Sequence, residues 1–469
     1  MSQQIQRVNE SLIELGKKKA SLFAFFSAMP KGGDLHHHYS GSVYAETYAD
    51  YVISKDYYLN LKTLEVKKEI DDTTVISTSE WKKFSQINNL EEVKADLVRK
   101  WSIKDFDHGH SNMSSADHFF TTFSDFSVAS RDTLEEGLAE LKNRALLQNL
   151  SYLETIFYRI NWKDAQLKNE EQVDKELLNF QKNKDANGLF EYLDGLHNNL
   201  KPKIDSITDL HNKNVKELHN KVVPDTDNLI VRYQNYCLRF RQPTDMFIEL
   251  MSCFNSAEKS DLLIGANIVA PEHGETSMRD YWLHMYYYKF LRSKYKNVKF
   301  SVHAGELTLG LVRPELLGKH IKEAIDIAKP KRIGHGLDII YDSDFTNTIK
   351  KLSNSNTAIE INLTSNEFIL NVVDDLHPIE VYHNYKIPMV ICTDDEGVLR
   401  SSITEQYVLL RHRYELSYMD IKELVYNSIK YSLIEEEDIK QKLLDKLDRD
   451  FDEFEKKIPE LEPLFILGK

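Results

Sequence analysis

The sequence is poor in cysteine and contains no long apolar run. Its 469 residues include only three cysteines, Cys237, Cys253 and Cys392, which show no paired spacing. An odd, unpaired set does not build a disulfide framework and favours a reducing, cytoplasmic compartment. No stretch reaches the roughly 18 consecutive apolar residues that a membrane helix needs, so we expect no membrane partner.

Positive charge is also scarce. The chain carries 60 Lys and Arg residues against 74 Asp and Glu residues, a formal net charge of −14. An acidic chain repels the phosphate backbone of nucleic acids, which argues against a nucleic-acid partner. The same charge is compatible with a small neutral or cationic ligand.

Eight short β-branched or aliphatic runs alternate with helical patterns. This alternation is typical of parallel βαβ units, and eight runs predict a closed (β/α)8 TIM barrel of the α/β class, one domain over residues 1–469. The rival is an open doubly wound sheet, but no glycine-rich phosphate loop follows the first run. The predicted strands are Gly33–His38, Leu150–Tyr158, Leu229–Cys237, Leu262–Val269, Lys299–His303, Arg332–His335, Thr357–Leu363 and Pro388–Thr393.

Four segments lie outside the predicted strands, and the first two of them do not fit a bare barrel. Residues 45–140 and 162–226 predict helical insertions, which suit a lid or a homodimer contact; the alternative is a solvated helical hairpin. Residues 403–469 predict charged helices that close the bottom or side of the barrel. Residues 17–28 join a basic start to an apolar run, as a signal peptide of an exported protein does. The other interpretation is an amphipathic helix packed under the barrel.

Histidines stand at two predicted strand ends. Alternate residues of a strand point the same way, so His36 and His38 project together into the barrel while His37 points outward. His303 ends a later strand, and the carboxyl ends of all barrel strands share one face. Imidazole nitrogens at about 2.0–2.1 Å are typical zinc ligands. These three histidines therefore predict a zinc site.

Acidic residues and a further histidine follow other strands. Glu306 comes after the permissive Gly305 and can act as a general acid if an apolar pocket keeps it protonated. His335, between two glycines, suits a base or supporting role. Asp394 can complete the metal site, because buried carboxylates need a cation, and Asp395 is left to bind substrate. Three His and one Asp leave a position for water, which predicts one catalytic zinc per chain.

These motifs resemble those of the adenosine deaminase family of metal-dependent hydrolases. The similarity spans about residues 29–440 and lies in the segments Met29–His38, His303–Glu306, Gly334–Gly336 and Thr393–Asp395. The opening Met-Pro-Lys-Gly-Gly, the long insertion and Phe119–Phe123 look closest to growth-factor-like extended deaminases. Thr364-Ser-Asn366 and Cys-Thr-Asp-Asp-x-Gly-Val instead resemble deaminases of N6-modified AMP.

The resemblance implies a reaction and its residues. Hydrolytic deamination of adenosine or deoxyadenosine to inosine or deoxyinosine and ammonia is implied, with AMP, N6-modified AMP or adenine as alternative substrates. His36, His38, His303 and Asp394 would bind zinc, and His38 would also border the substrate. Glu306 would protonate purine N1, His335 would orient or deprotonate the attacking water, and Asp395 would bind N7.

Three positions depart from the family pattern. Ser40 stands where an acidic residue or Asn often meets the sugar, which leaves open how the sugar and its 5′ group are recognised. Ala270 replaces a glycine whose amide commonly meets the purine, and Pro271 stiffens the turn that follows. Glu396 replaces the proline that is usual after the Asp pair.

Three other classes of protein fit these residues less well. A binuclear amidohydrolase would usually place a carboxylated Lys near the end of the fourth strand, and Gly265–Glu272 contains none. A non-catalytic binding protein on this scaffold would lack Glu306 or a metal ligand. A structural zinc site would commonly use thiolates, which are scarce here.

Overall fold

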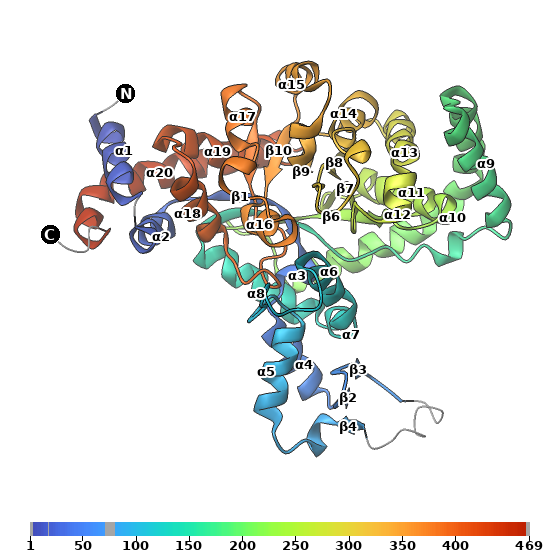
Figure 1. Ribbon diagram of the computed structural model, residues 1–469, viewed down its shortest axis with the longest axis horizontal. Coiled ribbons are helices and arrows are strands. Elements are labelled where there is room, and N and C mark those ends of the chain that lie inside the picture. The colour runs from blue at the N-terminus through green and yellow to red at the C-terminus, as the bar shows by residue number, and fades with distance from the viewer. Residues whose placement is uncertain (1–2, 17, 71–79, 466–469) are drawn as a thin grey trace.

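A computed structural model describes residues 3–16, 18–70 and 80–465. Eight parallel strands form one sheet in chain order, with helices around it (Figure 1), which confirms the predicted barrel. Each predicted run contains a strand, and the observed ends differ by at most two residues. The strands are β1 (Gly32–His38), β5 (Leu150–Ile156), β6 (Ile230–Leu238), β7 (Leu263–Val269), β8 (Lys299–Ala304), β9 (Arg332–His335), β10 (Ala358–Ile361) and β11 (Met389–Ile391).

The sheet closes just beyond the last strand. The backbone of Asp394 donates a hydrogen bond to the His36 carbonyl at 2.8 Å, and the His38 amide donates to the Asp394 carbonyl at 2.9 Å. These bonds form an isolated parallel bridge between His37 and Asp394. Closure therefore occurs at the carboxyl edge of the strands and brings the first and last predicted motifs together.

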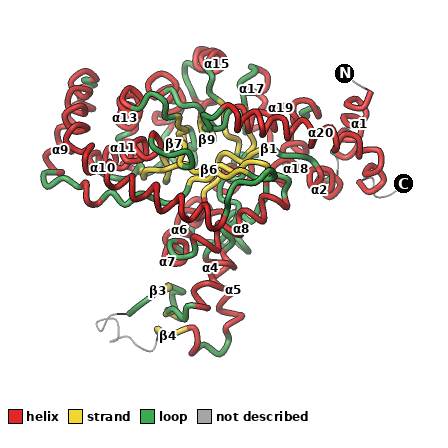
Figure 2. Tube along the Cα trace, turned by 180° about the vertical axis from the view of Figure 1, so that it is seen from behind, coloured by secondary structure: helices red, strands yellow, loops and turns green. Residues whose placement is uncertain are grey.

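Helices between the strands, and two that follow the last strand, cover the outside of the barrel (Figure 2). Their inner faces are rich in buried aliphatic and aromatic residues, and α11, for example, buries Met246, Phe247, Leu250 and Phe254 against the sheet side. These helices are α8 (Leu134–Leu147), α11 (Pro243–Glu258), α13 (Tyr281–Lys294), α14 (His320–Glu323), α15 (Phe345–Asn354), α16 (Leu363–Leu370), α17 (Ile379–Asn384), α18 (Ile403–Arg413) and α19 (Tyr418–Lys430).

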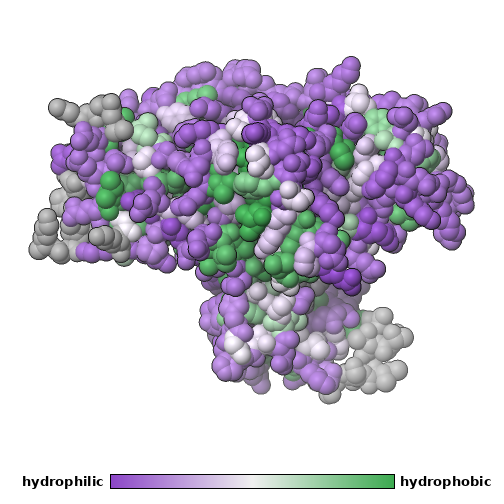
Figure 3. Space-filling model, turned by 45° about the horizontal axis from the view of Figure 1, so that its top comes forward, coloured by the Kyte–Doolittle hydropathy of each residue, from purple (hydrophilic) through white to green (hydrophobic). Residues whose placement is uncertain are grey.

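The segment 45–140 forms a projection from the barrel (Figure 1). It is not purely helical, which corrects the prediction: a three-stranded antiparallel sheet, in the order β3-β2-β4, lies among its helices. These strands have two or three residues each, too short to show a strand period in the sequence. Apolar side chains gather on the surface where the projection meets the barrel (Figure 3). The segment follows α3 (Tyr39–Ser42), and its elements are α4 (Ala45–Ser54), β2 (Tyr58–Asn60), β3 (Val66–Lys67), β4 (Trp81–Lys83), α5 (Leu90–Lys100), α6 (Ser115–Asp125) and α7 (Ser127–Ser130).

The segment 162–226 contains α9 (Glu170–Asn183) and the 37-residue α10 (Ala186–Val222). Along α10, Leu189, Leu193, Leu200 and Ile204 are buried at helical spacing. Thr208 of α10 donates a hydrogen bond to Asn255 of α11 at 2.6 Å. The long helix is thus packed against the barrel along one face rather than solvated on all sides.

The apolar segment near the amino end forms α2 (Lys19–Ala28), which follows α1 (Gln3–Leu15). Leu22, Phe25 and Phe26 are buried. Phe25 meets Phe454 of α20 (Glu437–Phe465) and Phe26 meets Tyr407 of α18, with ring centroids 5.3 and 5.9 Å apart. Among the described residues, no helix combines the length and apolar character needed to span a bilayer.

Candidate functional site

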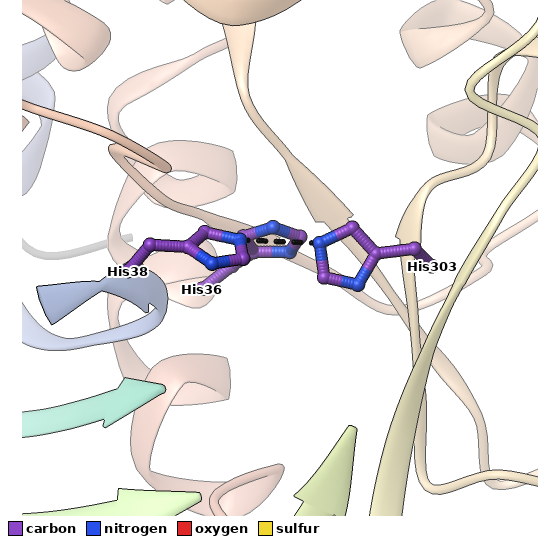
Figure 4. A group of neighbouring side chains, drawn as sticks. All are labelled: His36, His38 and His303. Atoms are coloured by element: carbon purple, nitrogen blue, oxygen red, sulfur yellow. Dashed lines mark hydrogen bonds between the residues drawn. The ribbon is translucent and has the colours of Figure 1, made fainter. Parts of the chain in front are cut away.

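Three histidine rings converge at the carboxyl ends of β1 and β8 (Figure 4). The Nε2 atoms of His38 and His303 are 3.2 Å apart. Asp394 adds a carboxylate, with Oδ1 at 3.4 Å from His36 Nε2 and 3.3 Å from His38 Nε2. One ring nitrogen from each of the three histidines lies within 4.8 Å of the others. Lone-pair donors from distant parts of the chain thus face a common point.

The donor set fits a metal cation. His36 Nε2 is buried and has no hydrogen-bond partner within the described part of the chain. Burial lowers the pKa of His38 to about 4 and lowers that of His303 well below its usual value, so both rings are neutral near pH 7, as ligands must be. Burial opposes charge on His36 too, but Glu360 and Asp394 raise its pKa to about 10. The pocket therefore attracts positive charge, and a nitrogen and oxygen donor set suits a transition metal such as zinc.

Two residues that sequence analysis missed orient these rings. Glu360 of β10 bonds Nδ1 of His36 at 2.6 Å, and Asn267 of β7 bonds Nδ1 of His303 at 3.0 Å through Oδ1. Each ring thereby directs its Nε2 toward the common point. A signal was available, because Glu360 is the only charged residue in the otherwise apolar run Ala358–Ile361.

The Glu360 carboxylate belongs to a buried charged ladder inside the barrel. Arg332 donates from Nε to Glu360 and from Nη2 to Glu154, both at 2.5 Å. Burial alone would raise the pKa of Glu360, but Arg332 and His36 lower it to about 2. Glu360 is therefore ionised. Among the described residues, Glu154 pairs with Arg332 in this ladder and does not contact the three histidines.

Glu306 lies beside the three histidines, and hydrogen bonds hold the backbone of the turn that carries it. Gly305 has a φ of 81°, a conformation that favours glycine, and lets the chain turn after β8. The buried Glu272 carboxylate accepts from the amides of Gly305 and Glu306 at 3.0 and 2.9 Å, and His320 holds Glu272 at 2.5 Å. Burial, with the charges of Asp394 and Glu272, raises the pKa of Glu306 to about 8. Glu306 is consequently protonated at neutral pH and can donate a proton.

His335 is held in one tautomer by a chain of hydrogen bonds. The Ile379 amide donates to His377 Nδ1 at 3.2 Å, so the neutral His377 ring carries its proton on Nε2. That proton is donated to Asn366 Oδ1 at 3.1 Å, which directs the Asn366 amide nitrogen to His335 Nδ1 at 3.0 Å. Burial lowers the pKa of His335 to about 3, so the ring is neutral. His335 therefore presents Nε2–H toward Glu306 and Asp394, at 3.8 and 3.9 Å.

The remaining predicted residues border the same end of the barrel. Asp395 is buried, and its Oδ1 has no partner among the described residues. A Cβ on Gly41 would lie 1.7 Å from that oxygen, so α3, which also carries the half-buried Ser40, packs directly on Asp395. Ala270 has a φ of 84°, the left-handed conformation expected where a glycine is usual.

The Glu396 side chain is directed to α8 and not to the three histidines. Its carboxylate accepts from Arg144 at 2.9 Å and from Gln148 at 2.6 Å, both on or next to α8. The departure from the family pattern at this position therefore serves packing between the last strand and α8.

Residues 204–450, just over half of the chain, match the family model described as Adenosine deaminase. The chain is 30% identical to the adenosine deaminase of Clostridium perfringens over 147 residues, which cover 31% of this chain and 40% of that protein. It thus spans about two fifths of the length of this relative.

Two solved structures share the fold. The N6-mAMP deaminase of Arabidopsis superposes with a TM-score of 0.55 at 20% identity, over 90% of this chain and 99% of the other. An amidohydrolase from Burkholderia ambifaria with bound Zn superposes with a TM-score of 0.53 at 14% identity, over 93% and 95% of the two chains. At such identities the likeness concerns the fold.

Proposed function

This chain belongs to the adenosine deaminase family, and from that premise we propose that it removes the 6-amino group of adenosine or deoxyadenosine by hydrolysis. The observation that carries the proposal is the convergence of three histidines and one carboxylate beside the buried Glu306. The reaction adds water across the C6–N1 bond and releases the amino group as ammonia, leaving a carbonyl at C6.

We further propose that His36, His38, His303 and Asp394 hold one zinc ion. The buried His36 Nε2, which forms no hydrogen bond with the described residues, and the neutral rings of His38 and His303 support this assignment. When bound, the ion would lower the pKa of a coordinated water to near neutrality and so supply the nucleophile. The zinc reported in the Burkholderia amidohydrolase is consistent with this choice of metal.

Glu306 and Asp395 act on the purine ring as proton donors. Ring nitrogens N1 and N7 of a 6-aminopurine are acceptors, so each needs a donor opposite. Glu306, whose pKa is raised to about 8, gives its proton to N1 as water adds to C6. Burial and the neighbouring Asp394 raise the pKa of Asp395 well above its usual value, so its carboxyl can donate to N7.

His335 orients the attacking water rather than deprotonating it. Because Asn366 donates to Nδ1, the ring has its proton on Nε2 and no free lone pair on the side of the site. A donor at this position holds the water oxygen and stabilises negative charge as it develops there. Of the two roles expected for His335, the tautomer favours the first.

The proposal is tested on purified protein with a panel of aminopurines. Adenosine, deoxyadenosine, AMP, N6-methyl-AMP and adenine are incubated in turn, and the released ammonia or methylamine is measured together with the 6-oxopurine product. We expect adenosine or deoxyadenosine to have the highest kcat/KM. Preference for AMP or N6-methyl-AMP would instead assign the chain to a nucleotide substrate, and no turnover of any member would refute the proposal.

Replacing Glu360 by Gln should weaken metal binding about 10–100-fold, the usual effect of losing a partner that orients a metal-bound histidine. Gln keeps the size of the side chain, but it loses the charge that supports His36 and pairs with Arg332. The measurement is zinc affinity by competition with a chelator. Glu380→Gln, an exposed site on α17, is the matched control. Equal affinity in both variants would contradict the role given to Glu360.

Replacing Ser40 by Asp should penalise AMP far more than adenosine. Ser40 lies in α3, which packs on Asp395, and a serine hydroxyl can bond either a hydroxyl or a phosphate. A carboxylate there would repel a 5′-phosphate but accept from a free 5′-hydroxyl. The ratio of kcat/KM for the two substrates is compared between wild type and variant. An unchanged ratio would show that Ser40 does not face the 5′ group.

A further inference from the structure

A basic cavity lies at the other end of the barrel from the histidine cluster. It holds about 810 Å³ and opens between α13, the helical turn Ala324–Ala328 and α15. Lys299 and Lys331 line it at the amino ends of β8 and β9, whereas His303 and His335 stand at the carboxyl ends of the same strands. α13, α14 and α15 follow one another along this side of the barrel (Figure 1).

Nearly all the charged residues that line the cavity are basic. Seven of its residues are Lys or Arg, and Asp326 is the single carboxylate among the described lining residues. Asp326 is engaged by Lys351 at 2.7 Å. Arg292, Lys296 and Lys350 form no salt bridge with any part of the chain that the structure describes. Lys299 meets Glu435 at 3.8 Å. In a chain of net charge −14, the cavity therefore keeps a local excess of cations over the carboxylates that the described residues place beside it.

The cations also repel one another. Burial, together with Lys440 and Lys299, lowers the pKa of Lys331 to about 8. Outside the lining, burial and repulsion from Lys299 lower the pKa of Lys440 on α20 as well, against the opposite effect of Glu437. The Lys331 ammonium lies over the ring of Tyr431, at 4.7 Å from its centroid. An anion in the cavity would relieve this repulsion.

We propose that this cavity binds a nucleoside polyphosphate. Its volume lies within the range of about 300–1,000 Å³ typical of small-ligand sites. The phosphates would meet the lysines, and the apolar lining from Val298, Ile325 and Pro330 would take the base or sugar. A nucleic acid is disfavoured, because the acidic remainder of the surface repels an extended phosphate backbone.

Binding is tested with uridine triphosphate and inorganic tripolyphosphate on the full chain, by calorimetry. Uridine triphosphate carries no 6-aminopurine, so it does not report on the deaminase site, and uridine is the uncharged control. We expect the wild type to bind both triphosphates, uridine not at all, and the affinity to fall as salt is raised. Saturating adenosine should leave the affinity unchanged.

Two charge-reversal variants locate the site. Lys296→Glu/Lys350→Glu changes two exposed residues of the cavity, whereas Lys203→Glu/Lys216→Glu makes the same change in charge on exposed positions of α10. The cavity variant should weaken triphosphate binding at least about tenfold, and the α10 variant should not. Absence of binding in the wild type, equal weakening in both variants, or competition by adenosine would overturn the proposal.

Discussion

Replacing Glu306 by Gln is expected to lower kcat for adenosine about 10²–10⁴-fold, the usual contribution of general acid–base catalysis. Gln keeps the size and the hydrogen-bonding shape of the side chain but has no acidic proton for purine N1. The proton is available in the wild type because burial and the nearby charges of Asp394 and Glu272 raise the pKa of Glu306 to about 8. Steady-state kinetics with adenosine give the measurement.

The Glu306→Gln result is interpretable only if the metal stays bound. Glu306 forms no hydrogen bond or ion pair with His36, His38 or His303, all of which lie in the described part of the chain, so zinc content should equal that of the wild type. Glu315→Gln, an exposed carboxylate later in the same connection, is the matched control and should retain full activity. Near-normal turnover of Glu306→Gln would remove this residue from the mechanism.

Replacing His303 by Ala is expected to abolish zinc binding and turnover together. The wild type should contain about one zinc per chain, the stoichiometry of a mononuclear site with four protein ligands. Loss of a supporting hydrogen bond alone costs about 10–100-fold in metal affinity, so loss of a ligand should cost more. Metal analysis after dialysis against a chelator gives the occupancy of both proteins.

A separate substitution shows whether the loss is specific. His383→Ala removes a partly exposed imidazole that pairs with Asp420 on the outer helices, and it should keep both zinc and activity. Circular dichroism should show that His303→Ala remains folded, since this residue lies at a strand end rather than in the hydrophobic core. Two metals per wild-type chain, or full zinc occupancy in His303→Ala, would contradict the proposed ligand set.

The order of the strands and the motifs at their ends could be predicted from the sequence. The apolar runs are short and separated by helical patterns, which is typical of parallel βαβ units, and the absence of a glycine-rich phosphate loop favoured a barrel over an open sheet. Alternation along β1 was sufficient to direct His36 and His38 inward. The bond from His37 Nδ1 to Thr155 at 2.9 Å fits the outward direction predicted for His37.

The insertions were less predictable. The small sheet β3-β2-β4 consists of strands of two or three residues, which leave no periodic signal, and its pairing depends on contacts made within the projection. The packing of α10 on α11 similarly depends on bonds such as Thr208 to Asn255, between residues 47 positions apart.

By itself, the sequence determined the barrel, its eight strands and the residue types at the strand ends, because strand period and glycine turns are local properties. Only the tertiary structure decided which other side chains orient the residues at the strand ends. Glu360 reaches His36 across 324 positions, and Asn366 sets the tautomer of His335 across 31. The sequence likewise does not indicate the basic cavity in a chain of net charge −14, since its lysines come from separate helices, loops and the start of β8. Hydrogen bonding and electrostatics act over a few ångströms in space, and that proximity exists only after the barrel has closed.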